Sequence, residues 1–175
     1  PDYPALGLGN FMTGGGFLNS RLATRIRGKD GLSYGVGSRF TASSWDKNGS
    51  FSTFAIYAPQ NDGKLLKAFH EEINLVLEKG FAPDEVKDAK SGWLQRQKLG
   101  RSGDAQLVQS LVEADQKGRT MLWDRDLEAK IEALTPEQIH AAMKARIDPK
   151  QISIVRAGDF ERAKKDDKDS SEKVN

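Results

Sequence analysis

The fold of this 175-residue chain is decided by the stretch Gly14-Gly15-Gly16-Phe17-Leu18-Asn19-Ser20-Arg21-Leu22, followed closely by Arg27-Gly28-Lys29-Asp30-Gly31-Leu32-Ser33-Tyr34-Gly35. Its three successive glycines predict the end of a helix over 4–12, because glycine takes left-handed conformations without strain. Leu18, Leu22 and Ile26 then recur at every fourth position, which predicts a second helix over 17–27 with one buried stripe. Arg27 falls about 100° beyond the edge of that stripe, so its guanidinium is expected to point off the buried face.

After this helix the pattern changes to the alternation typical of strands. Leu32, Tyr34, Val36 and Phe40 share one face of a predicted strand over 32–41. A second strand is predicted over 49–58, where Phe, Ile, Thr and Tyr are frequent. The turn residues at 46–49 join the two strands as a hairpin. On this pattern alone, Tyr34 is a core tyrosine.

Helical periodicity follows the hairpin. The predicted elements are a long helix over 65–79, helices over 83–99 and 102–117, a short helix near Leu127 and Ile131, a helix over 135–147 and a last strand over 151–156. Within the 102–117 helix, Leu107, Val108, Leu111 and Val112 are expected to face inward. Thr135-Pro136-Glu137-Gln138 has the spacing of a capping box.

These elements predict an α+β fold with helices packed on a mostly antiparallel sheet. Residues 1–160 are expected to form one domain. The remaining segment, 161–175, is almost continuously charged or small and is expected to be a disordered tail.

Composition excludes several classes of function. The net charge is only +2 with 30% charged residues, so no nucleic-acid partner is expected. No run of 18 apolar residues occurs, and Pro1-Asp2-Tyr3 does not begin a signal peptide, so neither a membrane segment nor a targeting address is expected.

The chain is poor in metal ligands. It has no cysteine and two histidines, His70 and His140, which argues against a self-contained zinc site. His70-Glu71 starts like the H-E-x-x-H motif, but Asn74 stands where the second histidine is needed. No metal and no cofactor are expected in this chain.

Gly31-Leu32-Ser33-Tyr34-Gly35 matches the G-x-S-x-G pattern of serine hydrolases, and His140 lies downstream as that family's chain order requires. A nucleophile elbow needs a strand before the serine and a helix after it. Here a predicted helix precedes Ser33 and a predicted strand follows it, so a serine hydrolase is the least favoured alternative.

The stretch from Tyr3 to Gly37 resembles the C-terminal domain of the M16 (pitrilysin/insulinase) zinc peptidases. The shared pattern is a Gly-rich turn, Ser20-Arg21-Leu22, a helix, Arg27, six residues and Tyr34. The remainder of 3–160 is compatible with the same domain. The family's domain begins with strands upstream of the first helix, so the resemblance implies that this chain lacks its first strands.

The resemblance implies a clam-shell of two homologous domains facing a cavity. One domain carries an H-x-x-E-H zinc motif, and the other contributes an arginine and a tyrosine, which match Arg27 and Tyr34. The implied function is the non-metal half of a zinc-dependent peptidase that binds peptide substrate and stabilises the transition state. Zinc is then expected in a partner domain or subunit, and this chain alone is expected to be inactive.

Two alternatives stay open. Without the resemblance, Arg27 is an exposed cation near a helix end and Tyr34 a core side chain. If the chain is the domain that the resemblance implies, it is either part of an active peptidase or a non-proteolytic scaffold like the superfamily's core-type members.

The location of the protein is not decided by any residue of the sequence. The resemblance to bacterial members of the family implies a bacterial protein of the periplasm or the cytoplasm.

Overall fold

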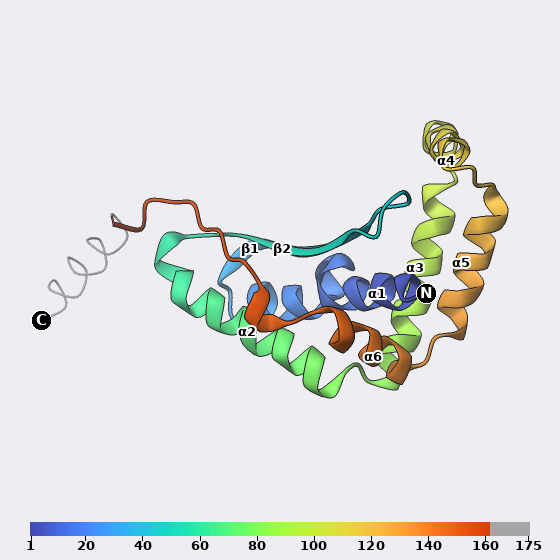
Figure 1. The fold of residues 1–175 in the computed structure, drawn as a ribbon. Coiled ribbons are helices and arrows are strands. Elements are labelled where there is room, and N and C mark those ends of the chain that lie inside the picture. Colours follow the sequence, from blue (N-terminus) through green and yellow to red (C-terminus); the bar gives the residue numbers. More distant parts are fainter. Residues whose placement is uncertain (162–175) are drawn as a thin grey trace, which may run out of the picture.

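The computed structural model of the protein describes residues 1–161 (Figure 1). The α-helices and strands in chain order are α1 Tyr3–Asn10, β1 Ser33–Ala42, β2 Gly49–Tyr57, α2 Asp62–Lys79, α3 Pro83–Gly100, α4 Asp104–Gln116, α5 Met121–Ala133 and α6 Pro136–Arg146. The short helical segments are the π-helical Phe11–Gly15 and Ala23–Lys29 and the 3₁₀ turns Phe17–Asn19, Pro59–Asn61 and Pro149–Gln151. The tail predicted over 161–175 lies, from residue 162 on, outside the described residues.

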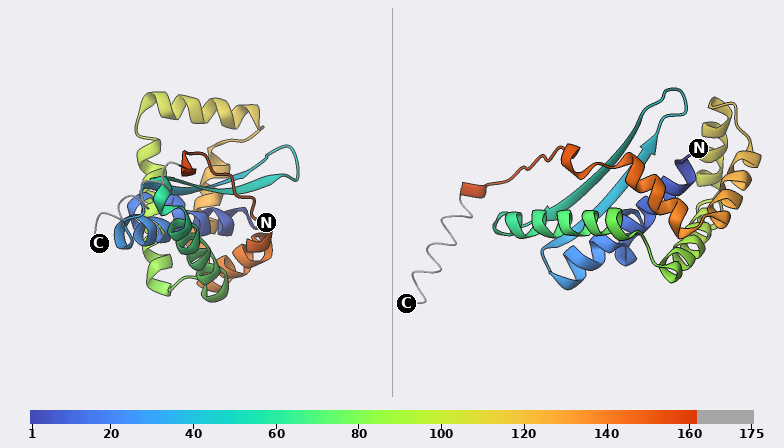
Figure 2. Two further views of the ribbon diagram at one scale, coloured as in Figure 1. Left: turned by 90° about the vertical axis from the view of Figure 1, so that its left-hand side faces the viewer. Right: turned by 60° about the horizontal axis from the view of Figure 1, so that its bottom comes forward.

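The strands β1 and β2 form a long antiparallel hairpin on one side of the helices, with α1 and α2 beneath it (Figures 1 and 2). α3 and α5 run side by side at one end, and α4 crosses beyond their ends (Figures 1 and 2). The predicted α+β class, with helices on an antiparallel sheet, is therefore confirmed.

One apolar core lies between the hairpin and the helices. The sequence predicts an apolar stripe on the long helix over 65–79, and five of its six members are buried in α2: Leu65, Phe69, Ile73, Val76 and Leu77. The sixth member, Leu66, is half-buried. Other core residues come from α1, from both π-helical segments and the residue before the second, and from α3, α5 and α6; they include Leu8, Met12, Leu22, Ile26, Val86, Ala89, Ile131, Ile139 and Met143. Periodic apolar residues in the sequence identify this core, because the burial of apolar side chains is the main driving force of folding.

The helix predicted over 17–27 is only partly correct. Leu22 and Ile26 are buried as expected, but Leu18 is exposed because residues 17–19 form a separate 3₁₀ turn. The segment from Ala23 to Lys29 is π-helical, with wider turns than an α-helix. The periodicity therefore identified the buried end of this segment and missed its irregular start.

The strand predicted over 151–156 is wrong. Residues 152–157 follow a 3₁₀ turn as irregular chain, and among the described residues they pair with no strand. Ile152 and Ser153 line a groove of about 400 Å³ together with Phe51–Thr53 of β2. An ion pair of 2.7 Å between Arg156 and Asp62 ties the segment to α2 instead. Strand-like composition gives a strand only where a partner edge is within hydrogen-bonding reach.

The inward face predicted for the helix over 102–117 is also wrong. Val108, Leu111 and Val112 on α4 are exposed and Leu107 is half-buried, so no residue of α4 is fully buried. The helix crosses the ends of α3 and α5 and so has little surface to pack against (Figure 2). Amphipathic spacing identifies an apolar face but not what covers it.

Candidate functional site

A β-bulge at the start of β1 turns Tyr34 out of the core. Ser33 pairs with Tyr57 and Gly35 with Ile56, so Tyr34 is the additional residue between two successive pairs. Its side chain is 87% exposed. The core position expected from alternation is wrong because the bulge shifts the pattern by one residue, as bulges do where they redirect a side chain.

Arg27 lies next to Tyr34. Its guanidinium carbon is 5.4 Å from the centre of the Tyr34 ring, within the range of a cation–π contact. Across residues 1–161, neither the Arg27 guanidinium nor the Tyr34 hydroxyl makes a hydrogen bond or ion pair with another residue. The structure thus brings the two predicted site residues together with their donors unused.

The other arginines of this segment are paired with carboxylates. Arg21 donates from Nε and Nη2 to the two Glu85 oxygens at 2.9 and 2.8 Å, and also from Nη2 to the Gly80 carbonyl oxygen at 3.1 Å. Arg25 pairs with Asp30 at 2.6 Å and with Glu71 at 2.8 Å. Arg27 therefore differs from both, because its charge has no such partner among the described residues.

The bridge from Arg21 to α3 was missed by the sequence analysis. Arg21 and Glu85 are 64 positions apart, so no local spacing pairs them. Glu85 also accepts a hydrogen bond from the Ala82 backbone at the start of α3. Arg21 is thus a structural residue that fixes the segment carrying Arg27 against α3.

Glu72 on α2 lies beside this network at 3.8 Å from Arg21. Burial raises the pKa of Glu72 above its ordinary value of 4.5, although the positive charge of Arg21 acts in the opposite direction. The folded state therefore holds the Glu72 proton more tightly than the unfolded state does. Stability contributed by protonated Glu72 is present at low pH and lost as the pH rises through the raised pKa.

Glu72→Gln is accordingly expected to gain stability relative to wild type as the pH rises from about 4 to 7.5, because the amide cannot ionise. Urea unfolding of both proteins at several pH values measures this difference. Lys64→Gln on the exposed side of α2 is the control and should show no such trend. A relative stability of Glu72→Gln that stays constant or falls with pH would contradict the assignment.

Ser33 is not placed for nucleophilic catalysis. It is 6% exposed, and its Oγ lies 2.9 Å from the Gly35 carbonyl oxygen and 2.7 Å from that of Ile56. His140 instead has Nε2 at 2.8 Å from the Leu77 carbonyl oxygen. The serine-hydrolase alternative lacks its required Ser–His contact, because Ser33 sits in the hairpin and His140 packs against the end of α2.

The two histidines do not assemble a metal site. His140 is held against the end of α2, and His70 packs edge-on against the neighbouring Phe69 ring. Within the described part of the chain, no group of three or more His, Asp or Glu side chains is arranged to hold a metal ion. None of the helices in that part has the length and apolar character needed to cross a membrane.

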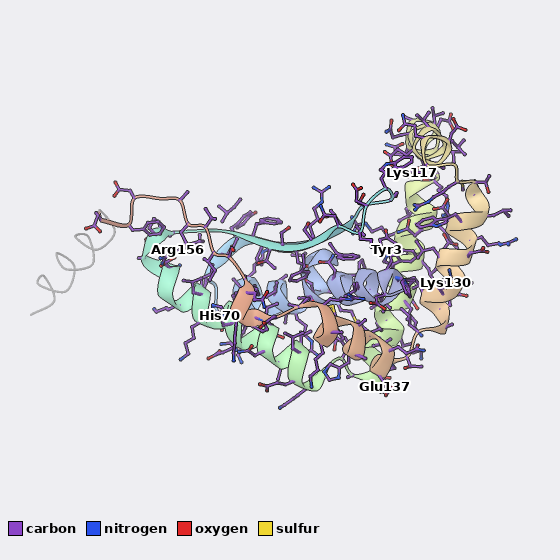
Figure 3. The ribbon with its side chains drawn as sticks, viewed as in Figure 1. Tyr3, His70, Lys117, Lys130, Glu137 and Arg156 are labelled. Atoms are coloured by element: carbon purple, nitrogen blue, oxygen red, sulfur yellow. The ribbon has the colours of Figure 1, made fainter. Side chains whose placement is uncertain are left out.

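A larger groove lies at the other end of the hairpin. It has a volume of about 870 Å³ and is lined by residues of α4, α5, the N-terminus and the hairpin turn. Figure 3 places Tyr3, Lys117 and Lys130 at this end. Its lining includes the cations Lys117, Arg119 and Lys130 and the anions Glu113, Asp124 and Asp126, so the lining has no strong net charge. It begins at Ala42, roughly 26 Å along β1 from Tyr34 at the usual rise per residue, and is a separate feature.

Comparisons with known proteins identify the family. The sequence profile described as "Peptidase M16 inactive domain" matches residues 1–92. An uncharacterized zinc protease of Streptomyces coelicolor is 28% identical over 140 residues, which is 80% of this chain and 30% of that protein. The chain therefore spans less than a third of the length of this curated relative.

Solved structures agree with the sequence match. The peptidase M16 inactive domain from Pseudomonas fluorescens superposes with a TM-score of 0.74 and 29% identity, covering 85% of this chain and 35% of that one. The periplasmic protease PqqL from Escherichia coli shares the fold, with a TM-score of 0.61, 22% identity and coverage of 82% and 15%.

The profile covers more than half of the chain and includes the stretch from Tyr3 to Gly37 that carries the resemblance. The relatives are zinc proteases and M16 inactive domains from bacteria. The chain belongs to the M16 peptidase family, and it is an inactive domain of that family.

Proposed function

We propose that this chain is the substrate-binding half of a zinc-dependent M16 peptidase, working opposite an H-x-x-E-H domain on the same polypeptide or on a partner subunit. Zinc belongs to that other half. The observation that carries the proposal is the pairing of Arg27 with the exposed Tyr34, which leaves the donors of both side chains unused.

The chemistry of peptide hydrolysis explains what the pair does. Attack on the peptide carbonyl places negative charge on its oxygen, and a fixed donor near such an oxygen contributes about 2.7 to 4 kcal/mol in enzymes where one has been removed. The Arg27 guanidinium and the Tyr34 hydroxyl are suitable donors. The cation–π contact holds them in one arrangement before the substrate arrives.

Reconstitution tests the proposal. This chain alone is expected to bind no stoichiometric zinc and to cleave no peptide, because its two histidines lie in different surroundings and it has no thiolate. Adding the H-x-x-E-H half should give an assembly with one zinc and peptidase activity. Metal analysis and a peptide cleavage assay of each half and of the mixture supply the measurements.

Two results would point elsewhere. One tightly bound zinc in this chain, with His70 and His140 as ligands, would contradict the proposal that zinc belongs to the other half. A stable assembly that binds peptides but cleaves none would favour the non-proteolytic scaffold. The exposed Arg27–Tyr34 pair favours the peptidase, because both donors are placed where a substrate could reach them.

A further inference from the structure

The segment between Arg27 and Tyr34 folds back on itself and so brings the two side chains together. Six residues separate them in the sequence. The chain reverses at Gly31, whose φ of 61° is a left-handed conformation that favours glycine. Neither side chain of the pair has another polar partner within residues 1–161. The position of the pair therefore depends on how this turn is held.

Arg25 and Asp30 close the turn from the two sides of Arg27. The Arg25 carbonyl oxygen accepts a hydrogen bond from the Asp30 backbone N–H at 2.9 Å. The Arg25 Nε donates to Asp30 Oδ2 at 2.6 Å. The same two residues are thus joined through the main chain and through their side chains, and Arg27 lies in the loop that they close.

This contact depends on the π-helical geometry of Ala23–Lys29. A π-helix joins residues five apart by backbone hydrogen bonds, whereas an α-helix joins residues four apart. In an α-helix the backbone partner of Arg25 would be Lys29, and two cations do not pair. The π-helical turn brings Asp30 to Arg25 instead. Such turns are rare and frequently occur at functional sites.

Further contacts join the turn to α2 and to the residue before it. The Arg25 Nη2 donates to Glu71 Oε2 on α2 at 2.8 Å. Because the apolar stripe of α2 is buried in the core, this helix is a rigid support. Asn61, directly before α2, donates from Nδ2 to the Leu32 carbonyl oxygen at 3.3 Å. The turn is thus fixed to an element that the core holds in place.

Stability alone does not explain the contact between Arg25 and Asp30. The two side chains are 30% and 22% exposed, and an ion pair in contact with water contributes little to the stability of a fold. A group that must meet a transition state has a stricter requirement, because a displacement of about 1 Å is enough to slow catalysis severely. The contact lies where it would prevent such a displacement of Arg27.

We infer that Arg25 and Asp30 are positioning residues that hold Arg27 against Tyr34. This inference rests on the proposed function and adds two residues that act through the pair. The Asp30 carboxylate keeps Arg25 and the turn in place, and the turn keeps Arg27 next to the Tyr34 ring. Loss of either partner of the ion pair loosens the turn and lets the Arg27 guanidinium leave the ring.

The test uses Asp30→Ala in the peptidase assembled from this chain and its zinc-bearing half. We expect kcat to fall by about fivefold, because a displaced donor stabilises the transition state less. KM and the zinc content should stay near the wild-type values. In an Arg27→Ala background, Asp30→Ala should have no further effect on kcat, since Asp30 acts through Arg27. A residue needed only for stability would slow the enzyme in both backgrounds.

Nuclear Overhauser effects between the Arg27 side chain and the Tyr34 ring give a readout that does not depend on activity. They are measured in the full 175-residue chain. We expect them in the wild-type protein, where the guanidinium carbon lies 5.4 Å from the ring centre. Asp30→Ala should weaken or remove them.

Glu128→Ala is the matched control. Glu128 on α5 pairs with Arg101 at 2.6 Å, and the two side chains are 24% and 26% exposed. This ion pair therefore has the same length as the one between Arg25 and Asp30 and a similar exposure. Its removal should leave both kcat and the nuclear Overhauser effects unchanged.

A second variant keeps the test decisive if Asp30→Ala does not fold. Arg25→Gln breaks the same ion pair from the other side and carries the same expectations. Failure of both variants to fold would contradict the inference, because the contact would then be needed for stability.

The outcomes separate this inference from the proposed function. If Tyr34→Phe and Arg27→Ala slow the peptidase while Asp30→Ala keeps the wild-type kcat, the positioning role is wrong and the proposed function stands. If Tyr34→Phe and Arg27→Ala leave kcat unchanged, the proposed function fails, and the nuclear Overhauser effects decide whether Asp30 holds the pair. Wild-type effects in Asp30→Ala would overturn the inference in either case.

Discussion

Tyr34→Phe in the assembled peptidase is expected to lower kcat by tenfold or more, which corresponds to about 1.4 kcal/mol or more in the activation barrier. The substitution keeps the ring that contacts Arg27 and deletes only the hydroxyl. Because Tyr34 is exposed, the loss of the hydroxyl leaves no unsatisfied group in the core. Arg27→Ala is expected to have an effect at least as large. Both variants should keep the wild-type zinc content.

The matched control is Tyr57→Phe on the neighbouring strand. The Tyr57 hydroxyl donates to Asp62 at 2.7 Å, so it is used within the fold. Its removal should affect stability slightly and leave kcat unchanged. Steady-state kinetics and metal analysis of the purified variants give the comparison. Unaltered kcat/KM in both Tyr34→Phe and Arg27→Ala would leave the family assignment in place and remove the catalytic role proposed for the pair.

Gly14→Ala is expected to destabilise the fold by about 3 kcal/mol, at the upper end of the usual cost of overpacking. A Cβ at this position would lie 2.6 Å from the Ser38 backbone nitrogen and 2.5 Å from its Oγ. β1 would have to move away from the π-helical segment, which would also disturb the hydrogen bond between Ser38 and Asn10. Urea unfolding compared with wild type measures the loss.

Gly7→Ala in α1 is the control for this prediction. Nothing lies within 4 Å of a Cβ at Gly7, so alanine should be neutral or raise the free energy of unfolding by up to about 1 kcal/mol through its helix propensity. Adding Ser38→Gly to Gly14→Ala should restore only part of the stability, since the contact with the backbone nitrogen remains. A fully stable Gly14→Ala protein would contradict the close approach seen between these segments.

Local patterns in the sequence were enough for much of the fold. The capping box at Thr135 is confirmed, since its Oγ1 accepts from the Gln138 backbone and the Gln138 side chain accepts from the Thr135 backbone. The end of α2 at Gly80, which has a φ of 68°, is confirmed as well. Such features depend on residues within a few positions of each other, so the sequence displays them directly. The single domain over 1–160 stays a prediction.

The candidate site came from the resemblance to the M16 family, in which Arg27 and Tyr34 match an arginine and a tyrosine. The tertiary structure decided how the two side chains are presented. Alternation predicted a buried Tyr34, and the bulge opposite Tyr57 turned it outward. The pairing of Arg21 with Glu85 joins residues far apart in the sequence. Because of this pairing, Arg21 is a structural residue, whereas Arg27 has no carboxylate partner among the described residues. Strand register and long-range ion pairs form between segments that meet only in the folded chain. The local periodicity of the sequence therefore does not predict them.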